Sequence, residues 1–267
     1  MERWMVRKLM FVAAMCGAWA TPAMADLIGT VNLREINTSP GVILTVDSSG
    51  YGPGGAWVGV YNLQLSGVAG VPAWMNPYLT DNVQSFCIDL WDNSYLGTPG
   101  HPYEVKTLDE APDPMEAPGG LGMGGARAGY LATLLNKYWV PGLTDSTEAA
   151  ALQSAVWEIV DEHRLIAPDP ALWNARNDDA GGTLPASGDF YVSDDTIANR
   201  SNVMLAFVAG AGVSPFNNYV GLSDHSTDEN APLGEWQDYV VRVPLPAAVL
   251  IGILGLGTAG WKLRKYA

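Results

Sequence analysis

Two apolar segments, one at each end of this chain, restrict the folded part of the protein to the residues between them. The first segment follows a basic N-terminus and ends at the small-residue run Ala23-Met24-Ala25. A basic start, an apolar stretch and small residues at the cleavage point are the pattern of a secretory leader. We therefore expect residues 1–25 to be a signal peptide, which signal peptidase removes together with Cys16.

The second apolar segment runs from Val243 to Trp261, and the basic tail Lys262-Leu263-Arg264-Lys265 follows it. A helix needs about 20 apolar residues to cross the core of a bilayer. We expect a C-terminal transmembrane helix whose cationic end stays in the cytoplasm, because basic residues are retained there. The body of the protein then lies on the far side of the membrane.

The entry to this segment is Val243-Pro244-Leu245-Pro246-Ala247. With the helix and the basic tail, it resembles the VPLPA variant of the PEP-CTERM sorting signals found in Gram-negative exopolysaccharide producers. The resemblance covers residues 243–267. It implies transient anchoring in the inner membrane, cleavage by an exosortase, and a final location at the cell surface or outside the cell.

Residues 26–242 form the body between these signals, which is long enough for one domain with a sizeable core. The full chain has 14 basic and 28 acidic residues and a net charge of −14. Such a field repels phosphate backbones, so nucleic acid is excluded as a partner. The acidic loops at 178–179, 194–195 and 224–230 lack the ligand spacing of an EF-hand. We expect no metal site and no cofactor.

The spacing of apolar residues predicts an α+β fold, with a mainly antiparallel β-body, a helical insert and the C-terminal transmembrane helix. Runs rich in Val, Ile, Leu and Tyr are separated by Gly and Pro clusters, which is typical of strands. Two stronger 3.6-residue patterns and one weaker one indicate helices. The expected strands are 28–33, 41–47, 57–65, 83–90, 103–108 and 236–243, and the expected helices are 126–138, 149–164 and 202–209.

Cys87 is the only cysteine left after export, so it cannot form a disulfide within the chain. It lies in the run Phe86-Cys87-Ile88-Asp89. Strand alternation places Cys87 and Asp89 on one face and the large apolar residues on the other. A lone buried thiol is often only a small apolar residue, which is one interpretation of Cys87.

Gln153 lies in the helical pattern after the N-cap candidate Asp145, on a flank shared with Val156, Trp157 and Val160. A buried amide is costly unless it is hydrogen-bonded or chemically consumed. One reaction explains both residues. The Cys87 sulfur attacks the Gln153 side-chain carbonyl, ammonia leaves, and an internal thioester remains.

Two short motifs carry a family resemblance: Phe86-Cys87-Ile88-Asp89, and Ala151-Leu152-Gln153-Ser154-Ala155-Val156-Trp157. Together they resemble the paired signature of bacterial thioester domains, which are surface-adhesin modules. The stretch 128–138 also fits, and the resemblance spans about residues 28–207. It implies covalent attachment to an amine- or hydroxyl-bearing surface or matrix molecule. Members of this family usually lie at the tip of a fibre that is anchored in the cell wall, whereas this chain carries a Gram-negative-type sorting tail.

This chemistry gives four further residues expected roles. Asp89 is the candidate acid, base or orienting group beside the thiol. The candidate shields that keep water from the thioester are Phe86, Trp157 and Tyr130. The reaction is a single-turnover self-modification, so we do not expect an enzyme.

Two alternatives stay open at this point. A cysteine hydrolase would pair Cys87 with His101, His163 or His225 as a base, although no cysteine-protease signature surrounds Cys87. A non-covalent matrix or carbohydrate-binding protein is the stronger alternative. Ten tryptophans and eleven tyrosines provide stacking surfaces for sugars, and the sorting tail implies an exopolysaccharide setting.

Overall fold

The structure, a computed structural model, describes residues 27–48, 54–90, 100–111, 122–161, 167–175, 190–224 and 236–243. The predicted signal peptide lies outside these residues, and so do the predicted sorting signal and transmembrane helix beyond Val243. Within the described ranges, no helix combines the length and the apolar character that a membrane crossing requires.

The described residues form a seven-stranded antiparallel sheet and three α-helices, which confirms the expected α+β class and its mainly antiparallel β-body. The strands are β1 (Leu27–Ser48), β2 (Gly54–Ala69), β3 (Val83–Cys87), β4 (His101–Thr107), β5 (Phe190–Val192), β6 (Tyr219–Asp224) and β7 (Tyr239–Arg242). The helices are α2 (Gly124–Tyr138), α3 (Ser146–Asp161) and α4 (Asp195–Ala211), with short 3-10 turns η1 (Asn76–Tyr78) and η2 (Leu108–Glu110).

The sheet closes on itself. Its order is β2-β3-β7-β6-β4-β1-β5, and β2 also pairs with β1, so six of the strands form a ring. β7 and β1 lie on opposite sides of this strand ring, and the Tyr239 hydroxyl donates across it to Glu35 Oε2 at 3.1 Å. The rings of Tyr61 and Tyr103 pack against Tyr239, with centroids 5.4 and 6.3 Å away. An aromatic and polar cluster therefore occupies the inside of the ring.

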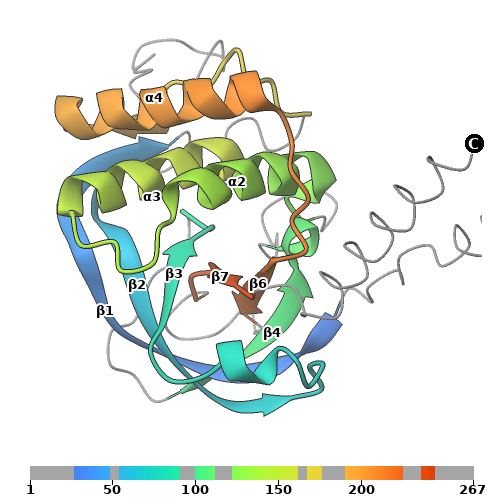
Figure 1. The fold of residues 1–267 in the computed structure, drawn as a ribbon. Helices are drawn as coiled ribbons and strands as arrows, with labels where there is room; N and C mark the ends of the chain where they lie inside the picture. Colours follow the sequence, from blue (N-terminus) through green and yellow to red (C-terminus); the bar gives the residue numbers. More distant parts are fainter. Residues whose placement is uncertain are drawn as a thin grey trace, which may run out of the picture.

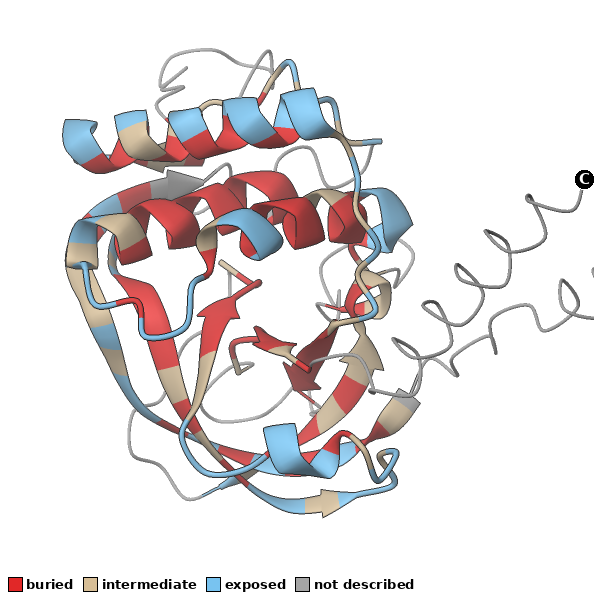
Figure 2. Cartoon of the chain, viewed as in Figure 1, coloured by how far each residue is buried: buried red, intermediate tan, exposed pale blue. Residues whose placement is uncertain are grey.

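α3 is the central helix of the molecule. β1 and β2 continue past the strand ring as an extension, in which residues 41–46 pair with residues 54–59 and the end of β1 also pairs with β5. α3 packs against this extension and against β3, while α4 packs on α2 and α3 (Figure 1). Every residue from Ala149 to Val160 is buried, whereas α4 exposes its outer face (Figure 2). α3 thus lies between the sheet and the outermost helix.

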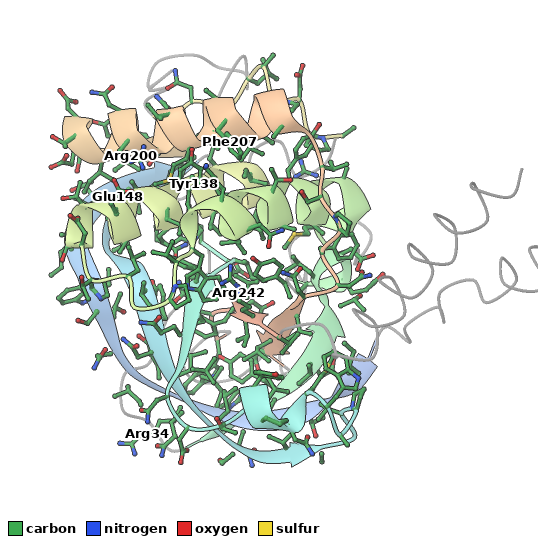
Figure 3. All side chains as sticks on the ribbon, viewed as in Figure 1. Arg34, Tyr138, Glu148, Arg200, Phe207 and Arg242 are labelled. Atoms are coloured by element: carbon green, nitrogen blue, oxygen red, sulfur yellow. The ribbon has the colours of Figure 1, made fainter. Side chains whose placement is uncertain are left out.

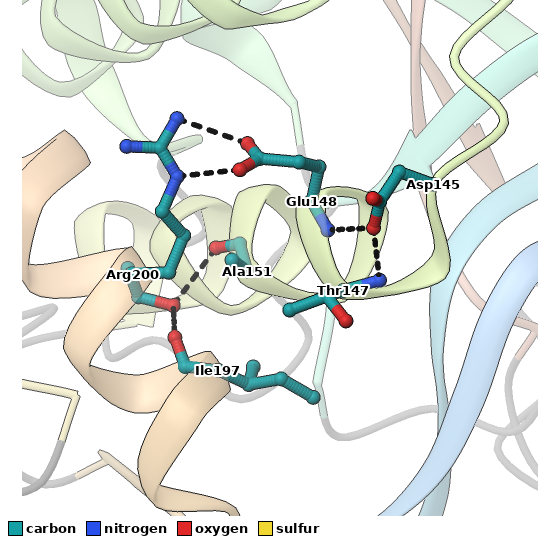
Figure 4. A network of polar contacts seen from close by, with 7 residues as sticks. Asp145, Thr147, Glu148, Ala151, Ile197 and Arg200 are labelled. Carbon is teal, nitrogen blue, oxygen red and sulfur yellow. Dashed lines mark hydrogen bonds and ion pairs between the residues drawn. The ribbon is translucent and has the colours of Figure 1, made fainter.

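The start of α3 is fixed by a cap and by contacts with α4 (Figure 4). Asp145 Oδ1 accepts the backbone N–H groups two and three residues later, at 2.8 and 3.0 Å, which confirms the predicted N-cap. The Glu148 carboxylate accepts two hydrogen bonds from Arg200 of α4, at 2.7 and 3.0 Å. The Ser201 hydroxyl donates to Ala151 O at 2.9 Å. These contacts fix where α3 lies along α4.

Aromatic contacts join the end of α2 to α4 (Figure 3). Tyr138 and Phe207 meet edge to face, with centroids 5.7 Å apart. Arg200 lies over the Tyr138 ring at 5.5 Å, and Lys137 lies over the Phe207 ring at 5.4 Å. These contacts pack α2 and α4 against each other, and both helices also pack against α3.

Several predicted bounds were wrong. The strand expected at 83–90 ends at Cys87, because its pairing with β7 stops at Cys87↔Tyr239. The alternation expected beyond Cys87 fails for the same reason, and residues 85–89 are all buried. The strands expected at 28–33 and 41–47 are parts of one long strand, β1. The weak helix expected at 202–209 is the longer α4, which Asp194 caps.

Candidate functional site

The structure brings Cys87 and Gln153 together, although 66 residues separate them in the chain. The backbone N–H of Cys87 donates to Gln153 Oε1 at 2.9 Å. In return, Gln153 Nε2 donates to the Cys87 carbonyl oxygen at 2.8 Å. Both residues have no exposed surface. The side-chain amide of Gln153 is therefore satisfied by the peptide groups of Cys87, in a site closed to bulk water.

The end of β3 explains why a helix side chain reaches this strand. The β2–β3 pairing ends at Tyr61↔Ser85, so β2 provides no paired residue for Cys87. α3 packs against β3 at this point, and the tip of β3 is directed toward the helices (Figure 1). A primary amide carries both a donor and an acceptor, like a peptide group. Gln153 thus continues the hydrogen bonding of the sheet at Cys87.

The Cys87 sulfur is held by three polar contacts. The thiol donates to the Asp89 carbonyl oxygen at 2.6 Å, and the Asp89 backbone N–H points back to the sulfur at 3.3 Å. The indole N–H of Trp157 donates to the sulfur at 3.4 Å. Trp157 lies four residues after Gln153, so both project from the same face of α3. One helix face therefore contacts both the backbone and the sulfur of Cys87.

Burial raises the pKa of the Cys87 thiol well above its usual value. The hydrogen bond from Trp157 opposes this rise, whereas the nearby charge of Asp89 adds to it. At neutral pH the sulfur is therefore a thiol, not a thiolate. Any attack by this sulfur requires the removal of a proton inside the site.

Of the four predicted supporting residues, two contact the Cys87 sulfur and two contact other parts of the core. Trp157 contacts the sulfur directly, and Asp89 contacts it through its backbone. Phe86 is buried and packs edge to face against Trp139, with centroids 5.1 Å apart. Tyr130 is half-buried and packs against Trp173, also at 5.1 Å. Trp157 and Asp89 adjoin the thiol, whereas Phe86 and Tyr130 contact tryptophans elsewhere in the core.

Sequence reasoning missed Gln237. Its Nε2 donates to the Asp89 carbonyl oxygen at 3.3 Å, the same oxygen that accepts the Cys87 thiol. The backbone carbonyl oxygen of Gln237 accepts the Tyr103 hydroxyl at 3.0 Å. Gln237 lies just before β7, within the strand expected at 236–243. In the sequence, Gln237 stands between Trp236 and Asp238, and this neighbourhood does not indicate which residue its side chain contacts.

His101, a candidate base, belongs to another cluster. His101 Nε2 lies 2.6 Å from Asp224 Oδ1, and its ring stacks on Trp236 at 4.5 Å with 7° between the planes. His163 and His225 lie outside the described residues. The described contacts of the Cys87 sulfur are with Asp89 and Trp157. Among the described residues, the structure does not bring a histidine into hydrogen-bond contact with this thiol.

The acidic pair at 194–195 has a structural role. Asp194 Oδ1 accepts the N–H groups of Thr196 and Ile197 at 2.8 and 3.0 Å, and so caps α4. The acidic pair at 178–179 and residues 225–230 lie outside the described residues. Elsewhere in the described ranges, no three His, Cys, Asp or Glu side chains are grouped as metal ligands.

No family model, no curated protein and no solved structure matches this chain. The functional argument therefore rests on the geometry around Cys87 and Gln153.

Proposed function

We propose that Cys87 and Gln153 form an internal thioester, with which this exported protein attaches itself covalently to an amine- or hydroxyl-bearing partner. The observation that carries the proposal is the pair of reciprocal hydrogen bonds between the Gln153 amide and the Cys87 peptide groups. They hold the electrophilic side chain against the residue that bears the nucleophile. Such positioning contributes effective molarities of about 10⁵ M or more.

Thioester formation replaces the bond between Gln153 Cδ and Nε2 by a bond between Cδ and the Cys87 sulfur, and moves one proton from the sulfur to the nitrogen. The Cys87 sulfur adds to Gln153 Cδ, and the negative charge that develops on Oε1 faces the Cys87 N–H that already donates to it at 2.9 Å. The bond between Cδ and Nε2 then breaks. The nitrogen leaves as ammonia after it takes up the proton of the thiol. The loss of ammonia to solvent keeps the reaction from reversing.

Two groups assist this step. The Trp157 N–H stabilises the thiolate that the attack requires, because it donates to the sulfur at 3.4 Å. The carboxyl group of Asp89 is the proposed proton carrier between the sulfur and the leaving nitrogen, since its charge acts on the Cys87 thiol. Both residues belong to the two sequence motifs, Asp89 to the cysteine motif and Trp157 to the glutamine motif.

The thioester is then consumed by a partner. A primary amine, or a hydroxyl group, attacks Gln153 Cδ, and its proton passes to the sulfur as the bond between Cδ and Sγ breaks. Cys87 becomes a free thiol again, and an isopeptide or ester bond joins the two molecules. Because Gln153 Cδ stays bonded to the partner and the thioester does not form again, this is a self-modification and not a catalytic cycle. The burial of both residues supports survival of the thioester in water until contact.

The intact mass of the processed, exported protein tests the proposal, compared with the mass of the residues that remain after processing. The proposal expects the wild-type protein to lack the mass of one ammonia relative to its sequence. Cys87→Ala and Gln153→Ala should each restore the full mass expected for the variant. A wild-type protein of full mass with a titratable Cys87 thiol would instead support a structural role for the pair.

A non-covalent matrix role is the second candidate, and one observation favours it. The hydrogen bonds of Gln153 satisfy its buried amide without any reaction. A second observation counts against a sugar-binding role. In the described ranges only one tryptophan, Trp57, and one tyrosine, Tyr78, are exposed for stacking on sugars. The mass measurement separates the two candidates.

A further inference from the structure

The turn that follows β3 is held from the side of β7 by two consecutive residues. The Ile88 N–H donates to the Asp238 carbonyl oxygen at 2.9 Å. The Gln237 side chain donates to the Asp89 carbonyl oxygen at 3.3 Å. Gln237 is 6% exposed. These bonds continue the β3–β7 contact past the last paired residues.

The Asp89 carbonyl oxygen connects Gln237 to the reacting sulfur. It accepts the Cys87 thiol at 2.6 Å and the Gln237 amide at 3.3 Å. A carbonyl oxygen has two lone pairs and can accept both bonds. The direction of this carbonyl sets the direction of the thiol, and Gln237 holds that carbonyl in place.

The Gln237 amide presents its donor to the Asp89 carbonyl at a cost, and the same side chain also forms a hydrogen bond with Tyr61. The amide nitrogen faces the Asp89 carbonyl, because an oxygen there would oppose another oxygen. Gln237 Oε1 is then buried, and none of the described residues provides it with a hydrogen-bond partner. A buried unsatisfied acceptor is destabilising, and an apolar side chain of similar size would avoid this penalty.

We propose that Gln237 is a positioning residue for the chemistry of Cys87 and Gln153. Its Nε2 fixes the Asp89 carbonyl, and through it the Cys87 sulfur, against the Gln153 side chain. Two amides thus hold the end of β3 from its two sides, Gln153 from α3 and Gln237 from the β7 side. Gln153 loses its nitrogen in the reaction, whereas Gln237 forms no covalent bond. This inference rests on the proposed thioester.

The test compares Gln237→Met with a matched control, Gln64→Met. Met keeps the length of the side chain and removes the donor. Gln64 is half-buried on β2 and pairs in register with Arg34 of β1, away from the thiol. In the exported protein, Gln237→Met should slow the loss of ammonia after folding about 3- to 10-fold, the effect of one hydrogen bond that orients the attacking thiol. Gln64→Met should leave the rate within about twofold of wild type.

A second readout does not need the thioester. In the Gln153→Ala background, Cys87 stays a free thiol whose reaction with 4,4′-dithiodipyridine is followed directly. Without Gln237 the turn opens more readily, so Gln237→Met should speed this reaction by about threefold or more.

The outcomes are separable. Slower ammonia loss together with faster thiol reaction supports the positioning role. Unchanged rates in both assays overturn it. If wild type neither lacks ammonia nor captures methylamine, the proposed function fails, and the thiol assay alone decides whether Gln237 positions the sulfur. Should Gln237→Met not fold, Gln237→Asn makes the same comparison, because its shorter stem withdraws the amide from Asp89.

Discussion

Trp157 and Gln153 lie one turn apart on α3, and both contact Cys87: the indole reaches the sulfur at 3.4 Å, and the amide reaches the peptide N–H at 2.9 Å. The helix therefore presents a side-chain amide and an indole N–H to the same cysteine. Spacing of four residues is what places two side chains together on a helix face. The two motifs are joined in space by this single arrangement.

Replacement of Trp157 by Phe tests the indole donor. Trp157→Phe keeps an aromatic ring in the core but removes the N–H that opposes the rise of the Cys87 pKa. A hydrogen bond to a charged group contributes about 1.5–3 kcal/mol, so thioester formation should slow about tenfold or more. The measurement is the time course of ammonia loss by intact mass in freshly folded protein.

Trp173→Phe is the matched control for this substitution. Trp173 is also a buried indole, but within the described part of the chain its Nε1 has no hydrogen-bond partner. This variant should form the thioester at the wild-type rate. Equal rates in the two variants would show that the Trp157 donor does not act on the sulfur.

The thiol gives stability a pH dependence in the Gln153→Ala variant, where no thioester can form. The pKa of folded Cys87 is raised above its unfolded value, mainly by burial. The stabilising effect of the neutral thiol is therefore complete below about pH 8.5, the pKa of an unfolded cysteine. It is lost progressively as the pH rises above this value, since the unfolded chain then releases the proton first.

Urea denaturation between about pH 7 and 10 measures this loss. The free energy of unfolding of Gln153→Ala should begin to fall from about pH 8.5. Gln153→Ala with Cys87→Ser should stay level in the same interval. Above about pH 10 both should lose stability, because burial also raises the pKa of Tyr61 and of Tyr239. A fall near pH 8.5 that persists without the thiol would contradict this assignment.

The ion pair between α3 and α4 should contribute modestly to stability. Arg200 and Glu148 form a two-point contact, but their side chains are 34% and 38% exposed. Water and salt screen such a pair, so its coupling energy in a double-mutant cycle should be about 0.5–1 kcal/mol. Arg200→Met, Glu148→Gln and the double variant give this energy by thermal unfolding. A coupling near zero would mean that the cation contact with Tyr138 dominates the role of Arg200.

Local patterns predicted the parts of the fold whose cause is local. α3 and its cap at Asp145 follow from helical spacing and from a side chain that bonds the next turn. The long pattern at 126–138 likewise predicted most of α2. β5 has three residues and β6 has six, and pairing with β1, β4 and β7 defines them. Short strands without a distinct pattern cannot be recognised before their partners are known.

In the site, too, sequence patterns indicated the residues with a local signal and missed the one that depends on a distant contact. Cys87 and Gln153 stood out because a lone thiol and a core amide each need an explanation. Trp157 stood out by its spacing on the helix. Gln237 did not, since its contact with Asp89 spans 148 residues of chain. Only the closure of the sheet, which brings β7 beside β3, places them together.

Capture of methylamine by the full-length exported protein tests the central claim most directly. After incubation and digestion, peptide mass spectrometry should find Gln153 converted to its methylamide, while Cys87 is recovered as a free thiol. Cys87→Ala should capture none. An unmodified Gln153 in wild type, with Cys87 free before any amine is added, would contradict the account.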